Sequence, residues 1–184
     1  FFDLLELPYP TDQTGVLQRL ESERLICSVN GSYSVLNIGA LLLAKSLREF
    51  ESIKRKAARV VVYSGDSKLE TESDITGEKC YAVGFHGLVQ YVMGKLPQNE
   101  VIKDAIRKAV KLVSETVIRE LLANALIHQD FEATGASPAI EIYNNRVEIS
   151  NPGEPTVPVE RFIDGYHSRN ERLADLMRRF GICE

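Results

Sequence analysis

Apolar and polar residues alternate through "PAIEIYNNRVEIS" (138–150), and no other part of the chain constrains the fold as strongly. In an extended strand, alternate residues point to opposite sides, so Ile140 and Ile149 belong to one apolar face. Asn144-Asn145 can supply the left-handed residues of a tight turn between the two halves. The segment therefore predicts an antiparallel hairpin with one buried face.

The preceding helix carries a polar stripe. In "RELLANALIHQDF" (119–131), apolar residues fill a broad helical face, yet Glu120, Asn124 and His128 recur every four residues. Each four-residue step turns the helix by only about 40°, so these three side chains form one narrow line. A carboxylate in such a position is costly to bury unless something pairs with it. Either the three are ordinary surface groups, or they form one wall of a pocket as a base, a metal ligand and a third polar group.

Further segments complete an α+β pattern in the second part of the chain, residues 54–184. "RVVVYSG" (59–65) is rich in β-branched residues and predicts a buried strand, and the polar stretch 66–79 predicts a loop or an edge element. "GFHGLVQYVMGKL" predicts a helix that ends at Pro97, and "NEVIKDAIRKAVKLV" (99–113) is amphipathic, with its charges on one face. We expect a mixed sheet with helices on one face.

The first part, residues 1–50, predicts a helix over 14–26 and then a hairpin whose turn is Asn30-Gly31. A helix followed by a hairpin is typical of the second half of a winged helix, but the hairpin tip is not basic. This part is therefore either a connector or a winged-helix-like element. A basic run follows it, and its side chains either form a solvated face or contact phosphate: Lys54, Arg55, Lys56 and Arg59.

Composition narrows the classes of function. The 184 residues carry a net charge of −4, so the chain has no general attraction for nucleic acid, and any DNA contact is local or lies outside it. The three cysteines form no CxxC or Cys/His cluster, which favours reduced thiols in the cytoplasm. No apolar run reaches the roughly 18 residues of a membrane span. The chain begins without methionine and ends directly after a helix, so we expect both ends to be cuts within a larger protein.

Two short motifs follow the hairpin. Its second strand runs directly into Asn151-Pro152-Gly153, which is either a simple turn or a place for a ligand to approach the backbone. In "HSRNERLADLMRRF", Ser168 and Glu171 fit a capping box at the start of the last helix. Arg169 in the same motif could face a phosphate.

Together these segments resemble a known family. "RELLANALIHQDF", "IEIYNNRVEISNPGEP" and "HSRNERLADLMRRFGICE" are similar to the ATP-binding domain of bacterial and archaeal transcriptional regulators that are also described as ATP-dependent DNA helicase-related proteins. These proteins carry a GHKL-type (Bergerat) ATPase module, an α/β sandwich shared with gyrase, Hsp90, histidine kinases and MutL. The resemblance is strong over 115–184 and looser towards the start. In the family a Schlafen-type AlbA domain precedes this region.

The resemblance implies roles for the polar stripe. Glu120 and Asn124 match the family's Glu and the Asn four residues later, so Glu120 would orient the attacking water and Asn124 would ligate Mg²⁺. An amide oxygen is a hard ligand that leaves several waters on the ion, and a carboxylate one turn away can reach such a water. His128, at the end of the motif, would orient its neighbours or approach phosphate.

The next family motif is Asp-x-Gly-x-Gly, whose Asp accepts a hydrogen bond from the adenine amino group. Here Asn151 replaces the Asp, Gly153 keeps the first glycine, Glu154 follows it, and the second glycine is missing. The Asn oxygen can still accept, without charge assistance. Arg169 would be a further contact to the nucleotide. The family's glycine-rich phosphate segment would follow Glu184, so we expect a C-terminally truncated module that does not turn over ATP by itself.

We therefore expect a nucleotide-binding module of a prokaryotic, DNA-associated transcriptional regulator, with ATP and Mg²⁺ as cofactors. Whether the longer protein is a Mg²⁺-dependent ATPase is left undecided by the sequence. DNA would be bound through domains outside this chain, a homodimer is possible, and no membrane partner is expected. The alternative is a degenerate GHKL fold that binds no nucleotide and acts as an interaction or dimerisation module. A helicase motor is poorly supported, because the chain has no GxxxxGK[ST] loop.

Overall fold

A mixed sheet organises the computed structural model, which describes residues 1–103, 106–111, 113–161 and 168–183. Its strands run in the order β4-β3-β7-β8. They are β3 (Arg59–Tyr63), β4 (Thr71–Thr76), β7 (Ala139–Ile142) and β8 (Val147–Ser150). β3 pairs with β7 in parallel, and the other pairs are antiparallel. The α+β class and the mixed sheet are confirmed, and the polar stretch 66–79 supplies the edge strand β4.

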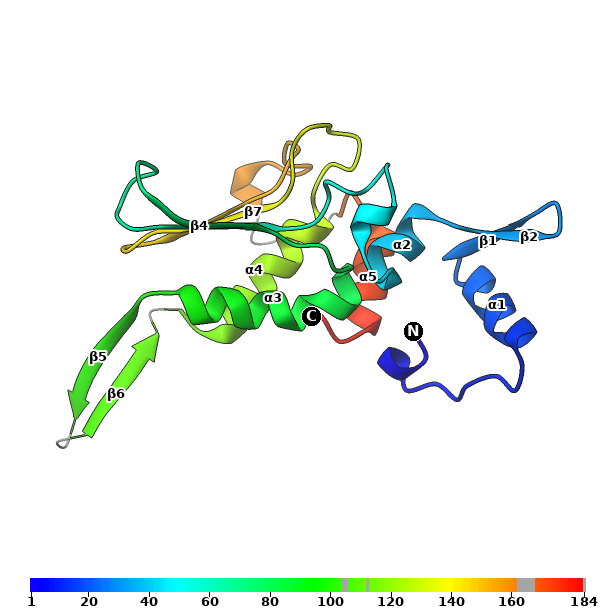
Figure 1. The fold of residues 1–184 in the computed structure, drawn as a ribbon, viewed down its shortest axis with the longest axis horizontal. Coiled ribbons are helices and arrows are strands. Elements are labelled where there is room, and N and C mark those ends of the chain that lie inside the picture. The colour runs from blue at the N-terminus through cyan, green and yellow to red at the C-terminus, as the bar shows by residue number, and fades with distance from the viewer. Residues whose placement is uncertain (104–105, 112, 162–167, 184) are drawn as a thin grey trace.

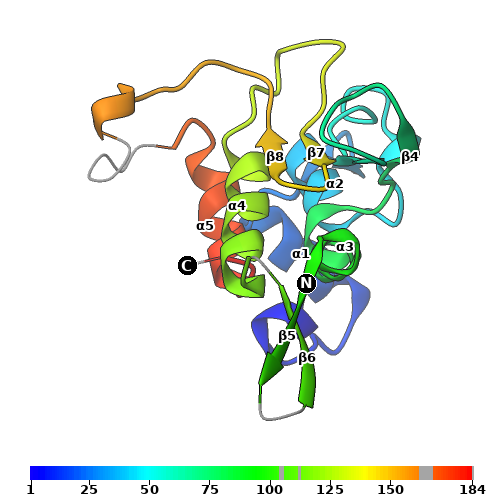
Figure 2. The same cartoon turned by 90° about the vertical axis from the view of Figure 1, so that its left-hand side faces the viewer.

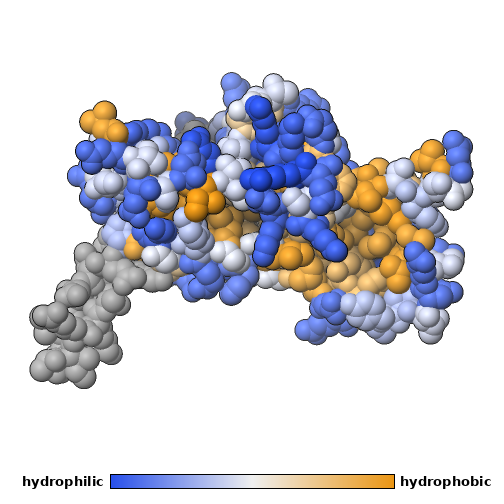
Figure 3. Space-filling view, viewed as in Figure 1, coloured by the Kyte–Doolittle hydropathy of each residue, from blue (hydrophilic) through white to orange (hydrophobic). Residues whose placement is uncertain are grey.

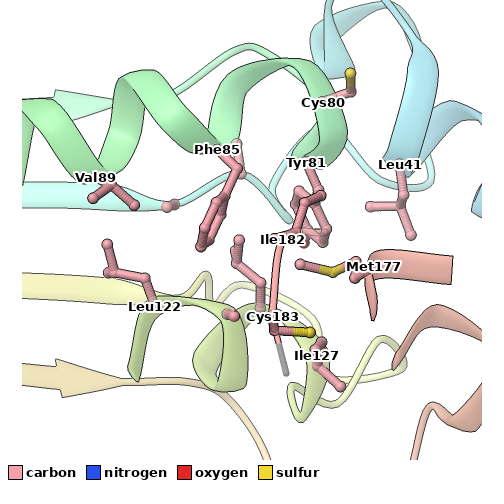
Figure 4. Close-up of a cluster of buried hydrophobic side chains, with 14 of the residues drawn as sticks. Leu41, Cys80, Tyr81, Phe85, Val89, Leu122, Ile127, Met177, Ile182 and Cys183 are labelled. Atoms are coloured by element: carbon pink, nitrogen blue, oxygen red, sulfur yellow. The ribbon is translucent and has the colours of Figure 1, made fainter. Parts of the chain in front are cut away.

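The helices α3 (Tyr81–Lys95), α4 (Glu115–Ile127) and α5 (Glu171–Arg179) complete the main body of the fold. In Figure 1, α3 and α4 lie beneath the sheet, and in Figure 2 α4 and α5 lie side by side. Their apolar faces form one core with the inward-facing residues of β3 and β7. Phe85 and Val89 of α3 meet Leu122 of α4 there, and Met177 of α5 and Ile182 continue the cluster (Figure 4).

The hairpin β7–β8 has the register that alternation predicts. Ile140 pairs with Ile149, and Ile142 pairs with Val147, so these side chains share the face that the helices cover. The expected turn was wrong in its detail, since neither asparagine of the connection has a positive φ. A four-residue loop replaces the tight turn, and the Tyr143 N–H donates to the Arg146 carbonyl at 2.9 Å. Left-handed residues are therefore not needed.

The opposite face of the sheet carries a small aromatic cluster. The Tyr63 and Tyr143 rings stack with their centroids 4.8 Å apart, and the Arg146 guanidinium lies 3.7 Å from the centre of the Tyr143 ring. The Tyr63 hydroxyl donates to Glu141, which also pairs with Lys68 at 2.6 Å. Glu141 thus links the Tyr63 hydroxyl and Lys68 on this face.

The N-terminal part contains η1 (Asp3–Leu5), α1 (Gln13–Ser22), β1 (Ile26–Val29), β2 (Ser32–Val35), α2 (Asn37–Leu43) and η2 (Leu47–Glu49). Asn30 and Gly31 have φ of 51° and 78°, so the hairpin turn is the left-handed type that Asn-Gly predicts. Val29, Tyr33 and Val35 are exposed on the hairpin, where Figure 3 shows apolar surface. Leu42 of α2 is fully buried in the same core as the sheet.

The segment 99–113 lies largely within a second hairpin, formed by β5 (Gln98–Lys103) and β6 (Ile106–Lys111). This hairpin follows the C-terminus of α3 and projects away from the rest of the molecule (Figures 1 and 2). The short helix η3 (Val159–Arg161) follows the sheet. Within the described part of the chain, no helix is long and apolar enough to cross a membrane.

Candidate functional site

A pocket of about 480 Å³ opens between α4, the end of β8 with the chain that follows it, and Arg169, which precedes α5. Its apolar lining comes from both elements and from the chain beyond β8: Leu121, Ala125, Ile149, Pro155 and Val157. Its polar lining is Asn124, His128, Asn151, Glu154, Thr156 and Arg169, and Gly153 completes it. The volume lies within the range of roughly 300–1,000 Å³ of small-molecule sites.

Helix α4 presents part of the predicted stripe to this pocket. Its N-cap is Ser114, whose hydroxyl accepts from the Val117 N–H at 3.3 Å. Asn124 is exposed on the pocket side, and Leu121, 45% exposed, lies on the same wall. The helix ends at Ile127, so His128 is its C-cap rather than a further helical residue. Burial lowers the pKa of His128, which favours the neutral imidazole.

Glu120 is the sequence-predicted site residue that does not line the pocket, as far as the described residues define it. It is half-buried, one turn before Asn124. Burial, followed by the negative charge of Glu120, raises the pKa of the Cys183 thiol, which places Glu120 near that residue. The neighbouring Arg119 donates to the carbonyls of Gly181 and Ile182 at 2.7 and 2.9 Å.

The predicted turn after β8 forms the second wall. The Asn151 amide donates only weakly to the Pro152 carbonyl, at 3.4 Å, so its side chain has capacity for a ligand. Gly153 has φ of +111°, and a Cβ there would lie 2.6 Å from Nη1 of Arg169 and 2.8 Å from Cβ of Asp130. This position therefore requires glycine for both its conformation and its contacts.

Arg169 is fixed at the third wall. Its Nη1 lies 3.0 Å from Oδ2 of Asp130, and its Nη2 donates to the Glu154 carbonyl at 2.7 Å. Backbone N–H donation and the Arg169 charge hold the pKa of Asp130 below its usual range. The predicted residue thus faces the pocket with its orientation set by a carboxylate that sequence reasoning missed.

The predicted capping box at Ser168 and Glu171 was wrong. Helix α5 begins at Glu171, and its N-cap is Asn170, which makes no side-chain cap. The Asn170 amide donates instead to the carbonyls of Ile127 and Gln129, at 2.6 and 2.8 Å. These carbonyls lie at the end of α4, where the last carbonyl groups have no partner within the helix. The Asn170 side chain therefore satisfies the end of α4 instead of capping the start of α5.

Lys56 corrects the prediction for the basic run. It is only 5% exposed, and its Nζ donates to the carbonyls of Asp130 and Ala133, at 3.0 and 2.7 Å. Burial lowers its pKa. Of the same run, Lys54 and Arg59 pair with Glu51 and Asp74. The apolar Ala57-Ala58 that follows Lys56 was a local sign that this lysine enters the core.

Buried hydrogen bonds hold the loop after α4 in place. Gln129 is fully buried, and its amide donates to the Tyr81 hydroxyl at 2.6 Å, which in turn donates to the Lys56 carbonyl at 2.7 Å. Together with Lys56 and Asn170, these bonds fix the loop that carries Asp130. No sequence pattern indicates them, because their partners are distant along the chain.

The donor set fits a nucleotide better than an isolated metal ion. No group of three or more His, Cys, Asp and Glu side chains suited to a metal occurs in the described part of the chain. The Asn124 amide is a single hard ligand, and Mg²⁺ commonly uses one or two protein ligands with waters and substrate phosphates. An ion held mainly by a bound phosphate group is compatible with this pocket.

Comparisons with known proteins agree with this architecture. Residues 135–184 match the family model described as "Putative ATP-dependent DNA helicase recG C-terminal", which confirms the resemblance for that stretch. The crystal structure of the DIP2311 protein from Corynebacterium diphtheriae superposes with a TM-score of 0.67 at 20% identity, over 90% of this chain. This chain spans about a third, 32%, of that longer chain. Curated protein sequences show no significant match.

Proposed function

We propose that this chain is a nucleotide-binding module that takes ATP with Mg²⁺ in the pocket between α4 and the end of β8. One observation carries the proposal. Asn124 and Asn151, at positions that correspond to two GHKL motif residues by resemblance, come from separate segments and line one pocket with Arg169, His128 and Gly153. The family match covers the wall that holds Asn151, Gly153 and Arg169.

Each wall has a chemical task in this proposal. The side-chain oxygen of Asn151 accepts from the exocyclic amino group of the base, with Ile149 and Ala125 providing apolar contact. Asn124 ligates Mg²⁺, and Arg169 and His128 approach the phosphates. When bound, Mg²⁺ would neutralise part of the phosphate charge. Glu120 orients a water in the longer protein, if that protein hydrolyses ATP.

The first test is titration of the chain with a non-hydrolysable ATP analogue, with and without Mg²⁺. We expect saturable, Mg²⁺-dependent binding that Asn124→Ala weakens by about 1–3 kcal/mol, because a contact to a charged group is lost. Glu120→Ala is the matched control on the same helix and should leave binding unchanged while removing any hydrolysis in the longer protein. Equal loss of binding in both variants would show that the roles are wrongly assigned.

The second candidate is an interaction or dimerisation module of GHKL-type fold without nucleotide. The position of Glu120 outside the pocket lining of the described residues favours it, since an ATPase needs this carboxylate at the phosphate end. The same titration separates the two functions. Absence of saturable binding, together with dimers in sedimentation, would support the second candidate.

At the level of the longer protein, we propose a cytoplasmic, DNA-associated transcriptional regulator. The match to a helicase-related family supports association with DNA, and the net charge of −4 indicates that the contact lies in other domains. The helix-hairpin of residues 1–50 would connect those domains to the nucleotide module. DNA binding by the longer protein, but not by this chain, is the expected result of an electrophoretic mobility assay.

A further inference from the structure

Two contacts to described residues hold the Arg169 guanidinium, and they engage only part of its N–H groups. A guanidinium has five N–H donors in one plane. One contact goes to the Asp130 carboxylate and one to the Glu154 carbonyl, and the side chain, 28% exposed, still lines the pocket. A guanidinium fixed in this way is suited to bind an oxyanion, because its side chain loses little conformational entropy on binding.

Asp130 is itself fixed on several sides. Its Oδ1 accepts from the Glu132 N–H at 2.9 Å, which leaves Oδ2 for Arg169. Its backbone N–H donates to the Pro152 carbonyl at 2.7 Å, and its own carbonyl accepts from Lys56. The carboxylate therefore has a set position relative to the turn at the end of β8.

The local charge balance favours an anion. Arg169 and the buried Lys56 contribute two positive charges, and Asp130 contributes one negative charge between them. Glu154, the carboxylate among the described residues that line the pocket, is exposed, so solvent and salt screen it. Without Lys56, the Asp130–Arg169 pair would be electrically neutral and would attract a phosphate group less strongly.

We propose that Asp130 is a positioning residue that holds the Arg169 guanidinium ready for the oxyanion group of the ligand. This inference rests on the proposed function. It adds that the anionic end of the nucleotide lies beside residues 153, 154 and 169. Asp130 does not line the pocket, so it acts through Arg169 rather than on the ligand.

The test compares three ligands by calorimetric titration: ATP, adenosine and inorganic tripolyphosphate. We expect Arg169→Gln to weaken ATP and tripolyphosphate by about tenfold or more, because contacts to a charged group are lost. Adenosine, which has no oxyanion, should bind with unchanged affinity. Asp130→Asn should weaken the same two anionic ligands by a smaller factor, and should cause no further loss when Arg169→Gln is already present.

The control is a second ion pair of the same length. Arg48 and Glu78 lie 3.0 Å apart on the surface, outside this pocket, so Arg48→Gln and Glu78→Gln should leave all three affinities unchanged. Thermal unfolding verifies that each variant folds. If Asp130→Asn does not fold, Asp130→Glu replaces it, because it keeps the charge while displacing the oxygens, and the same anion-selective loss is expected.

Two results would overturn the inference. One is an equal loss of adenosine and ATP in Asp130→Asn, and the other is an undiminished effect of Asp130→Asn in the Arg169→Gln background. Binding of tripolyphosphate without ATP or adenosine would overturn the proposed nucleotide function but leave the anion site in place. Binding of none of the three by the unaltered chain would overturn both.

Discussion

At the scale of the residue, Gly153 is the most constrained position of the pocket, and Gly135 is its natural control. Both have positive φ, but a Cβ at Gly135 would meet nothing within 4 Å, whereas one at Gly153 would meet Asp130 and Arg169. We expect Gly135→Ala to cost about 1–2 kcal/mol from conformation alone. Gly153→Ala should cost roughly 1–3 kcal/mol more, since neighbouring groups must shift. Urea denaturation measures both, and equal costs would show that the close contacts are unimportant.

Through His128, the stability of the fold depends on pH. Burial lowers its pKa in the folded state, so near its ordinary value of 6.5 the unfolded chain binds more protons than the folded one. This contribution therefore reduces stability as pH falls through about 6.5, and has no effect well above it. We expect the melting temperature of the unaltered chain to fall relative to His128→Gln between pH 7.5 and 5.5. A constant difference across this range would contradict the assignment.

At the scale of the element, α4 and α5 depend on each other through Asn170. Asn170→Ala would leave the Ile127 and Gln129 carbonyls without this donor, at an expected cost of about 1–3 kcal/mol. Asn145→Ala, in the exposed loop between β7 and β8, serves as control and should change stability little. Chemical denaturation measures both variants. If Asn170→Ala were neutral, water would replace the amide at the end of α4.

The elements themselves were largely predictable, but the contacts between them were not. Local patterns identified the hairpin with Asn30-Gly31 and the register of Ile140 and Ile149, because side-chain alternation and turn chemistry are properties of neighbouring residues. The family resemblance assigned Asn124 and Asn151 to one nucleotide site, and both line one pocket. Sequence spacing did not show that α4 ends at Ile127. Helical periodicity cannot reveal where a distant residue, here Asn170, donates to the carbonyls at the helix end.

The roles of charged residues were the least predictable. Lys56 sits in a basic run, and Asp130 follows the polar stripe, yet both owe their positions to carbonyls and side chains that are far away in sequence. The placement of Glu120 near Cys183 likewise depends on how the chain returns after α5. A one-dimensional pattern gives the residue type and the face, whereas ion pairing depends on the assembled fold.

At the scale of the whole molecule, Glu23 ties the N-terminal part to α5. Arg179 donates to both of its carboxylate oxygens, at 2.9 and 2.8 Å, and this pairing lowers the pKa of Glu23. Its stabilising contribution is therefore present at neutral pH and lost as pH falls below the unfolded value near 4.5. We expect Glu23→Gln to lower stability by about 1 kcal/mol at pH 7 and by less at pH 4.

Hydrogen exchange locates this effect. In Glu23→Gln, amides of residues 13–35 should exchange faster, while those of β3 and β7 should not change, because the sheet does not depend on this pair. Glu51→Gln, which removes a surface pair with Lys54, is the control and should alter neither group. Faster exchange throughout the sheet would mean that both parts unfold as one cooperative unit.

The bond from Arg169 to the Glu154 carbonyl joins two points that are fifteen positions apart in sequence. The stretch between them is thus anchored at both ends to the same few atoms. The entropy of closing a loop grows only with the logarithm of its length, so an anchored stretch can lengthen or shorten at little cost to the fold. Pro155, Thr156 and Val157 of this stretch line the pocket, so a change in its length would alter this lining while Gly153 and Arg169 keep their places.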